Sequence, residues 1–232
     1  MKRVGVIVAM RQEYDLARAV LECRREHLVR GMSLMEGNID GAELVLLQCG
    51  IGKVNSAIGA VEMIREHAPD IIINTGVAGG IHPDARVMDV IVGDEVAYHD
   101  VWCGDGNAWG QIQGLPPRFT SPRRLYHLAL ATPVPSGRLR GGLICSGDRF
   151  ITTNEEKDHI RARFPEALAV DMESASIAQT CHLYGIPFLA YRLISDTPGI
   201  EEHARQFRDF WNEAPARSFE MLRAIIRGAI NN

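Results

Sequence analysis

The sequence lacks the cysteine and histidine patterns that identify disulfide-rich and metal-binding proteins. Its five cysteines are odd in number and show no C-x-x-C spacing, which argues against a disulfide framework and a structural zinc site. Its eight histidines show no H-x-x-x-H or H-E-x-x-H spacing, which argues against a catalytic metal. We therefore expect reduced thiols and no metal ion.

The chain also lacks a block of like charge and a long hydrophobic run. Its 232 residues carry 25 Lys and Arg against 29 Asp and Glu, for a formal net charge of -4. This balance gives little support for binding to nucleic acid or to an anionic membrane. The first apolar run, residues 4–10, meets charged residues at once, unlike a signal peptide or a membrane span. We expect a cytoplasmic protein that acts on a small molecule.

Nucleotide-binding and hydrolase signatures are missing as well. The segment CGIGK has its glycines one residue apart and Val54 after Lys53, so it is not a P-loop. The G-x-G-x-x-G fingerprint does not follow the first strand, so we expect no dinucleotide cofactor. G-x-S-x-G is also absent, which weakens a serine-hydrolase interpretation.

Short β-branched runs alternate with helix-period stretches along the whole chain. This alternation is typical of a mostly parallel sheet covered by helices. The expected strands are 4–10, 33–40, 42–50, 71–74, 89–100, 142–151, 168–172 and 186–196, with a hairpin turn at residues 40–41 and a bend at Gly93. The expected helices are 11–22, 52–68, 121–131, 155–164, 173–184 and one or two in the tail to residue 230. With no repeat or linker, we expect residues 1–232 to form a single domain.

The segment 101–119 differs from its surroundings because it is rich in Gly, Pro and Trp and has no helical or strand period. A loop of this length in a compact domain is usually functional or in contact with a partner. Its two tryptophans favour contact with protein over disorder.

Polar residues stand where expected strands end, which is where open α/β sheets bind ligands. They are Glu13, Glu173, Asp196 and the glycine-rich segment 76–80, which we interpret as a turn that brings the backbone close to a ligand. Taken singly, Glu13 and Glu173 could be acids in a first helical turn, and Asp196 a helix cap. Their common position at strand ends favours a functional interpretation.

Seven motifs in order resemble the nucleoside phosphorylase and nucleosidase superfamily. They are VGVIVAMRQEYD, CGIGKVNSA, INTGVAGG, VGDEVAYHD, SGDRFI, AVDMESASIA and RLISD, and the similarity extends over nearly the whole chain. AMRQE together with RLISD is similar to the bacterial 5′-methylthioadenosine/S-adenosylhomocysteine nucleosidase branch. The resemblance implies a single-domain three-layer α/β/α fold with a central mixed, mostly parallel twisted sheet.

The resemblance also implies an activity, which is hydrolysis of the N-glycosidic bond of these two nucleosides to adenine and a 5′-thio-substituted ribose. Glu13 would activate the attacking water, and Asp196 would be the general acid at purine N7. Glu173 would hold the ribose hydroxyls, and Met172 would pack against the sugar. No cofactor is implied. The chemistry is coherent, because carboxylates stabilise the positive ribose and protonation relieves the departing base.

The resemblance implies roles for further residues from their positions in the motifs alone. Phe150 would stack on adenine and the Ile151 backbone would read its edge, while Ser195 and Arg192 would support this end of the site. Met10 and His99 would lie near the ribose and its 5′ side. The backbone of Val77, Ala78 and Gly79 would approach the substrate. Val77 replaces a serine that is frequent in the nucleosidases, so one hydroxyl near the water is missing.

The resemblance implies a homodimer with the loop 101–119 at or near the interface. We expect Trp102, Trp109, Ile112 and Leu115 to lie near the partner; alternatively, these side chains fill the core of their own loop.

Three other functions remain open. The first is phosphorolysis, although the segment GVAGG has no arginine, and Arg86 and Arg192 are the nearby candidates for a phosphate. The second is hydrolysis of another nucleoside such as futalosine or AMP. The third is a nucleoside-binding regulator that has lost the chemistry, which the three retained carboxylates oppose.

Overall fold

The strands and helices of the computed structural model alternate as the sequence predicts. The structure describes residues 3–19, 21–39, 41–134, 137–199, 203–213 and 220–230. Its strands are β1 (Arg3–Val8), β2 (Glu22–Val29), β3 (Met32–Ile39), β4 (Ala42–Gln48), β5 (Ile71–Gly80), β6 (Val90–Tyr98), β7 (Phe119–Thr120), β8 (Leu139–Ser146), β9 (Ala167–Asp171) and β10 (Phe188–Asp196). Its helices are α1 (Arg11–Arg18), α2 (Lys53–His67), α3 (Arg123–Leu130), α4 (Asn154–Arg161), α5 (Ser174–Tyr184), α6 (His203–Glu213) and α7 (Glu220–Ile230).

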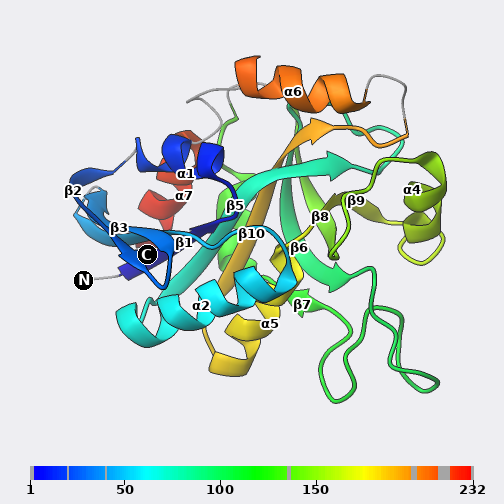
Figure 1. Cartoon of the computed structure of the whole chain (residues 1–232), viewed down its shortest axis with the longest axis horizontal. Coiled ribbons are helices and arrows are strands. Elements are labelled where there is room, and N and C mark those ends of the chain that lie inside the picture. The colour runs from blue at the N-terminus through cyan, green and yellow to red at the C-terminus, as the bar shows by residue number, and fades with distance from the viewer. Residues whose placement is uncertain are drawn as a thin grey trace.

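The strands form one twisted mixed sheet (Figure 1) in the order β10-β6-β8-β9-β5-β1-β4-β3-β2. Its centre is parallel, because β1 pairs with β4 and β5, and β5 also pairs with β10. The antiparallel pairings of β6 with β10 and of β5 with β9 connect this centre to the parallel group of β6, β8 and β9. The result confirms the predicted α/β class with a mixed central sheet.

Five of these strands close into a ring. β5 pairs with β10, β10 with β6, β6 with β8, β8 with β9, and β9 returns to β5 at Gly79 and Gly80. Side chains are absent at both glycines, and a Cβ at Gly80 would lie 2.7 Å from the Ala85 Cβ. The absence of a side chain at Gly80 therefore makes room for Ala85 next to the point where the ring closes.

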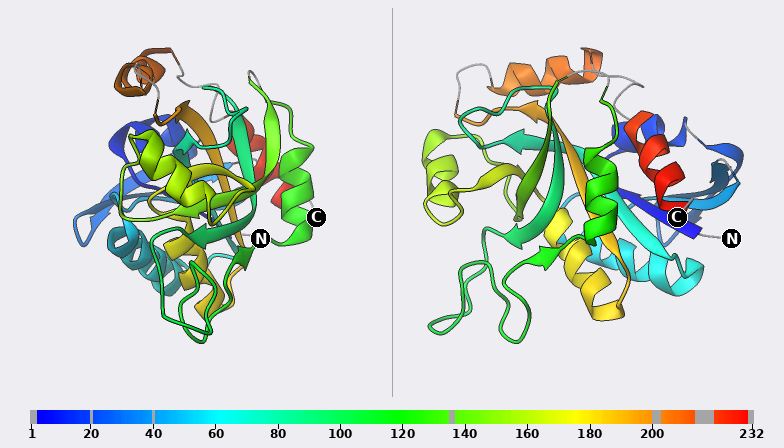
Figure 2. Two further views of the ribbon diagram at one scale, coloured as in Figure 1. Left: turned by 90° about the vertical axis from the view of Figure 1, so that its right-hand side faces the viewer. Right: turned by 180° about the vertical axis from the view of Figure 1, so that it is seen from behind.

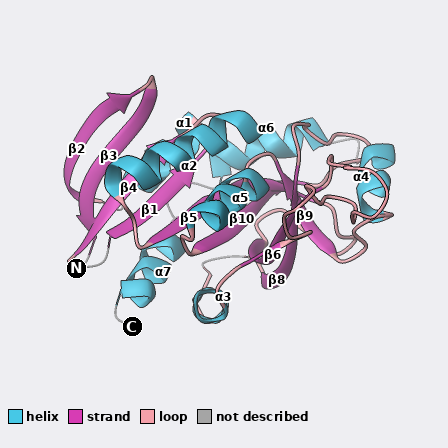
Figure 3. Ribbon diagram, turned by 90° about the horizontal axis from the view of Figure 1, so that it is seen from below, coloured by secondary structure: helices cyan, strands magenta, loops and turns pink. Residues whose placement is uncertain are grey.

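Helices cover both faces of the sheet (Figures 2 and 3). Val4, Val6 and Val8 of β1 point to one face, where α1, α3, α6 and α7 pack. Ile7 points to the other face, where it joins the core of α2 and α5. A third core beside α4 includes Ile160 and Phe164. The alternation of Val4, Val6 and Val8 with Ile7 along β1 is the period-two pattern of a strand that is buried on both sides.

Two predictions, one for the first helix and one for the segment 76–80, are wrong in detail. The first helix ends at Arg18, and Glu22, expected at its end, instead begins β2, which was not expected and pairs antiparallel with β3. The glycine-rich segment 76–80 is not a turn, because it continues β5 as regular strand. Its pairing with β10 and β9 supplies backbone hydrogen bonds that outweigh the low strand propensity of glycine.

Several local predictions are confirmed. β3 and β4 form the antiparallel hairpin, of which residue 40 lies outside the described residues. The register shifts between Gly93 and Glu95, as a bulge there requires. Gly185 caps α5 with a φ of 69°, in the left-handed region that glycine adopts readily. Residues 101–118 form a long loop, which projects from the lower part of the molecule in Figure 1.

Within the described residues, no helix has both the length and the apolar character needed to cross a membrane.

Candidate active site

A cavity of about 460 Å³ opens where β1, β5, β9 and β10 end. The loops after β4 and β8 and one face of α6 complete its wall. The residues that line it are Ala9, Met10, Glu13, Ile51, Val77, Ala78, Gly79, Arg149, Phe150, Ile151, Val170, Asp171, Met172, Glu173, Ser195, Asp196 and Phe207. The cavity therefore lies at the strand ends, where the sequence analysis expects a ligand to bind.

The predicted site residues converge on this cavity with two exceptions. The three carboxylates of Glu13, Glu173 and Asp196 line it together with the other lining residues singled out from the sequence. Arg192 does not line the cavity; it contacts the lining residues Asp171 and Glu173 from behind and is 1% exposed. His99 lies outside the lining and packs against Gly147, where an added Cβ would be 2.4 Å from the histidine Cε1.

Backbone amides hold Glu13 in place. Its Oε2 accepts hydrogen bonds from the amides of Ala9 and Met10, both at 2.9 Å, and its Oε1 accepts one from the Val77 amide at 2.9 Å. Gly76 makes room for this carboxylate, because a Cβ there would lie 2.3 Å from Oε1 and its φ is 148°. Burial raises the pKa of Glu13, against the charge of Arg192 and these three amides.

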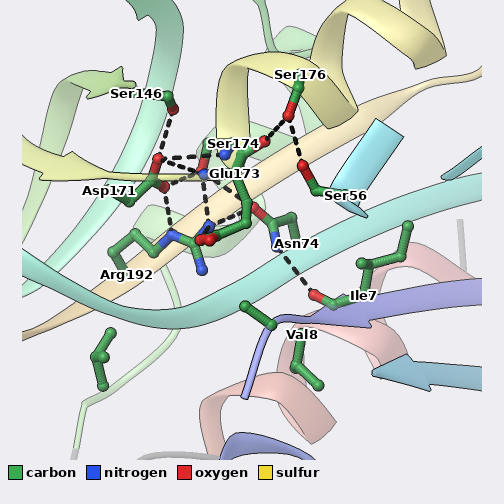
Figure 4. Close-up of polar contacts among 12 residues, drawn as sticks. Ile7, Val8, Ser56, Asn74, Ser146, Asp171, Glu173, Ser174, Ser176 and Arg192 are labelled. Atoms are coloured by element: carbon green, nitrogen blue, oxygen red, sulfur yellow. Dashed lines mark hydrogen bonds and ion pairs between the residues drawn. The ribbon is translucent and has the colours of Figure 1, made fainter. Parts of the chain in front are cut away.

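Arg192 is the centre of a buried polar network beneath the cavity (Figure 4). Its Nε donates to Asp171 Oδ2 at 2.6 Å, and its Nη2 donates to Asn74 Oδ1 at 2.5 Å and to Ser174 Oγ at 3.0 Å. Ser146 and Ser174 donate to the Asp171 carboxylate. Burial alone would raise the pKa of Asp171, but Arg192 and the two hydroxyls hold it below its usual range.

Glu173 lies between this network and the cavity. Its Oε2 is 3.8 Å from Arg192 Nη2, and its Oε1 accepts a hydrogen bond from the Gly52 amide at 3.0 Å. Burial raises the pKa of Glu173 to about 8, with Arg192 opposing the shift and Asp171 adding to it. One buried guanidinium thus faces three carboxylates, Asp171, Glu173 and Glu13. A proton is therefore easily retained in this group of acids.

Asp196 ends β10 on another side of the cavity. The register of β10 against β5 shifts between Ile194 and Asp196, which pairs Asp196 with Gly79. Ser195 Oγ donates to Asp196 Oδ1 at 2.5 Å. The carboxylate is 1% exposed, yet it lines the cavity. It can reach a bound molecule while remaining screened from bulk water.

Two aromatic rings flank the mouth of the cavity. Phe150 is 51% exposed, and its ring centroid lies 5.7 Å from that of Phe207 in an edge-to-face arrangement. Phe207 comes from α6, whose Gln206 accepts a hydrogen bond from the Thr197 amide at 2.9 Å. These rings offer flat apolar surface on which a heterocyclic base can stack.

The sequence did not reveal all of the site. Asp171 precedes Met172 at the end of β9, so the strand-end criterion applied to Glu173 could have found it. Asn74 donates to the Ile7 carbonyl at 2.9 Å and accepts from Arg192, and no local motif signals this role. Phe207 and Arg149 also line the cavity without a sequence signal.

The arrangement combines a largely apolar cavity with four buried carboxylates in its lining, those of Glu13, Asp171, Glu173 and Asp196. Such a site can stabilise a developing cation, accept a proton from water and donate one to a leaving group. Among the residues that the structure describes, no group of three or more His, Cys, Asp or Glu side chains is placed to hold a metal ion.

Comparisons with known proteins agree with this geometry. Residues 3–227 match the family model described as the phosphorylase superfamily. A 5′-methylthioadenosine/S-adenosylhomocysteine nucleosidase of Actinobacillus succinogenes is 39% identical over 97% of this chain and 98% of its own length. One of Chromohalobacter salexigens is 39% identical over 98% of this chain and 97% of its own.

A solved structure is similar over nearly its whole length. The 5′-methylthioadenosine/S-adenosylhomocysteine nucleosidase of Neisseria meningitidis, in complex with methylthio-immucillin-A, has a TM-score of 0.91 and 41% identity. The match covers 98% of this chain and 99% of the other. The chain therefore belongs to the phosphorylase superfamily and, within it, to the 5′-methylthioadenosine/S-adenosylhomocysteine nucleosidase family.

Proposed function

We propose that this protein hydrolyses the N-glycosidic bond of 5′-methylthioadenosine and S-adenosylhomocysteine, releasing adenine and the 5′-thio-substituted ribose. The observation that carries the proposal is the convergence of Glu13, Glu173 and Asp196 on one cavity. Relatives that carry this activity in their names are 39% identical over nearly their full length.

Glu13 is the group that accepts a proton from the attacking water. Burial raises the pKa of Glu13, whereas Arg192 and three amide donors favour its ionised form. In that ionised form the carboxylate is the base that takes the proton. Val77 contributes its amide to Glu13 but no hydroxyl to the water. The water in this protein is therefore positioned by the carboxylate without a serine at residue 77.

Glu173 and Met172 hold the ribose, and Met10 packs beside it. A partly protonated Glu173 can both donate to and accept from the ribose hydroxyls, which suits a pKa of about 8. Arg192 is a positioning residue, since it contacts Glu173 and Asp171 and does not line the cavity. Its charge opposes the rise in the pKa of Glu173 that burial causes.

Asp196 donates a proton to purine N7 as the glycosidic bond breaks. The bonding electrons move onto the base, and the proton neutralises the charge that develops there. Ser195 orients the Asp196 carboxyl group through their hydrogen bond. Phe150 stacks on the base, the Ile151 backbone reads its edge, and the backbone of Ala78 and Gly79 borders the substrate.

Phosphorolysis is the less favoured alternative. A phosphate beside the ribose needs cationic donors that face the cavity. Arg149 lines the cavity but is exposed and paired with Glu156. Arg192 directs its donors to Asp171, Asn74 and Ser174. Glu13, which lines the cavity, would repel the anion.

The deciding experiment measures adenine release by chromatography from each nucleoside, in phosphate-free buffer and again with added phosphate. We expect free adenine and a reducing sugar in equal amounts, at a rate indifferent to phosphate. Sugar 1-phosphate formed only with phosphate would establish a phosphorylase. Release from neither nucleoside would refute the proposal and direct the search to futalosine or AMP.

We further propose a homodimer in which the loop 101–119 lies at or near the interface. Several large apolar side chains are exposed just before and on α2, on the end of α5, which packs against α2, and in this loop. They are Ile51, Val54, Ile58, Leu183, Tyr184 and Trp102. Of the side chains expected at the partner, Trp109 and Ile112 pack partly against their own chain. Sedimentation velocity tests the proposal, and a monomer at micromolar concentration would refute it.

A cytoplasmic location and a single domain of residues 1–232 complete the proposal. Cys49, Cys103, Cys145 and Cys181 are free thiols, three of them buried, as is usual in a reducing compartment. One sheet runs through the described chain, which supports a single folding unit.

A further inference from the structure

Two buried serines of the sequence motifs have no role in the mechanism above. Ser56 belongs to CGIGKVNSA and lies near the start of α2, and Ser176 belongs to AVDMESASIA and lies near the start of α5. Their hydroxyl oxygens are 2.6 Å apart, although the two residues are 120 positions apart in the chain (Figure 4). This serine pair, Ser56 and Ser176, therefore joins the starts of two helices.

Each hydroxyl also has a backbone acceptor at the start of its own helix. Ser56 Oγ lies 2.8 Å from the Gly52 carbonyl oxygen, and Ser176 Oγ lies 2.8 Å from the Glu173 carbonyl oxygen. Two hydroxyls supply only two protons, so one hydroxyl donates to the other, and the second donates to its carbonyl. The contacts form a continuous path from Gly52 through the serine pair to Glu173.

Gly52 and Glu173 are also linked to each other directly, at the cavity. The Gly52 amide donates to Glu173 Oε1 at 3.0 Å. Gly52 is the N-cap of α2, Glu173 is the N-cap of α5, and Glu173 lines the cavity. Both atoms of this hydrogen bond therefore belong to helix starts that the serine pair holds together. A change in the spacing of the two helices would move the amide relative to the carboxylate.

Several other groups act on the Glu173 carboxylate. The titratable groups that face it are Arg192 of β10, Asp171 of β9, Glu13 of α1 and Cys49 after β4. Arg192 and the Gly52 amide lower the pKa of Glu173, whereas the two carboxylates raise it. The Cys49 thiol stays neutral because burial raises its pKa. Loss of the Gly52 hydrogen bond therefore raises the pKa of Glu173 further.

We propose that the serine pair positions the Glu173 carboxylate against the Gly52 amide, and thereby fixes the group that binds the ribose hydroxyls. This inference rests on the proposed function. Neither serine is among the residues that line the cavity, so both act through the two helix starts and not on the substrate. Small displacements of a group that orients a substrate are costly in rate.

The test follows kcat/KM for methylthioadenosine against pH in wild type, Ser56→Ala and Ser176→Ala. Both variants should fold, because the hydroxyl that remains keeps its own backbone acceptor. We expect each variant to lower kcat/KM by about 3- to 10-fold, the loss that one hydrogen bond between neutral groups can cause. The inflection that Glu173 contributes should move to higher pH by roughly half a pH unit. Glu173→Gln identifies this inflection, because its profile lacks it.

The double variant shows whether the two serines act as one unit. Either single substitution breaks the same hydroxyl–hydroxyl bond, so Ser56→Ala combined with Ser176→Ala should lose no more kcat/KM than the larger single loss. Losses that multiply would mean that the two serines act separately, and would overturn the assignment of the pair.

Thr180→Val is the matched control on α5. The Thr180 hydroxyl is also buried, but it donates to the Ser176 carbonyl at 2.9 Å within the same helix, so its loss should leave the inflection where it is in wild type. An unmoved inflection in both serine variants, or an equal shift in Thr180→Val, would overturn the inference. Adenine release from neither nucleoside by the wild-type protein would instead overturn the proposed function, and this inference with it.

Discussion

The floor and the rim of the cavity differ in burial and in what holds their charges. On the floor, Arg192 and Asp171 are each 1% exposed at the side chain, and their hydrogen bonds come from strand ends and from the start of α5. At the rim, Arg149 is 68% exposed and belongs to a loop. Removing one partner of a buried ion pair in the floor costs much free energy of unfolding, whereas removing one partner of an exposed ion pair at the rim costs little. The floor therefore holds the carboxylates of the site in place, whereas the rim contributes little to the stability of the fold.

The largest difference should appear when the proton donor is removed. Asp196→Asn keeps the shape of the side chain but cannot protonate the base, so kcat should fall by about 10²- to 10⁴-fold, as is typical of general acid catalysis. Steady-state adenine release measures it. Asp158→Asn, an exposed carboxylate of α4, should leave kcat unchanged. A turnover close to wild type in Asp196→Asn would remove the proposed acid.

The floor should also dominate stability. Asp171→Ala leaves Arg192 buried without its main counter-ion, and we expect the free energy of unfolding to fall by about 3–5 kcal/mol. Urea denaturation followed by circular dichroism measures this change. Asp158→Ala breaks an exposed pair with Arg161 and should cost less than about 1 kcal/mol. Equal losses in the two variants would abolish the distinction between buried and exposed charges.

Protonation of the floor should make stability depend on pH. The pKa of Glu173 is about 8 in the folded protein against an ordinary 4.5, so the folded state keeps a proton that the unfolded chain releases. The free energy of unfolding should therefore fall as pH rises from about 5 to about 8, where this contribution is lost. Glu13, whose pKa is also raised, acts in the same direction.

Thermal unfolding of wild type and Glu173→Gln across this range tests the assignment. The variant cannot ionise at this position, so its curve should be flatter. Asp171 has the opposite sign, because its pKa is lowered and its stabilisation is lost only as pH falls below its ordinary range. A wild-type curve that rises from about pH 5 to pH 8 would contradict the assignment to Glu173.

The smallest effect should come from the loop beside the rim. Trp109 Nε1 donates to the His99 carbonyl at 3.0 Å, and its ring lies 3.9 Å from the Arg163 guanidinium carbon. Trp109→Phe keeps a ring but loses the hydrogen bond, which should lower the free energy of unfolding by about 1 kcal/mol. Denaturation measures this change, and kcat for methylthioadenosine should stay as in wild type. A large loss of kcat would mean that the loop helps to form the floor.

Much of the fold could be predicted from the sequence because hydrophobic periodicity records local burial. The strands around Val6, Ile72 and Leu189 are predicted correctly for this reason. β2 could not be predicted, because its residues ECRREHLV carry charges that are as common in an exposed edge strand as in a helix. The glycines of β5 favour a turn locally, and only their pairing with distant strands makes them strand.

The candidate site was predictable where function coincides with a strand end. Glu13, Glu173 and Asp196 could be selected in this way, and they share the cavity. Partnerships across the chain were not predictable. Asn74 and Arg192 meet across 118 positions, and Arg192 was expected at the substrate although it lies behind Glu173. Such contacts are fixed by the tertiary fold and leave no local signal.

The closed ring of strands has a consequence for how the protein is made. β10 is the last strand in the chain, yet it lies between β5 and β6, which are joined to each other through it. Until it is synthesised, both strands present unpaired edges, and edges of this kind can pair with other chains. Arg192 and Asp196 also arrive with it. The growing chain thus covers the unpaired edges of β5 and β6 and completes its candidate site in the same late step. Termination before residue 188 would leave an aggregation-prone fragment without this site.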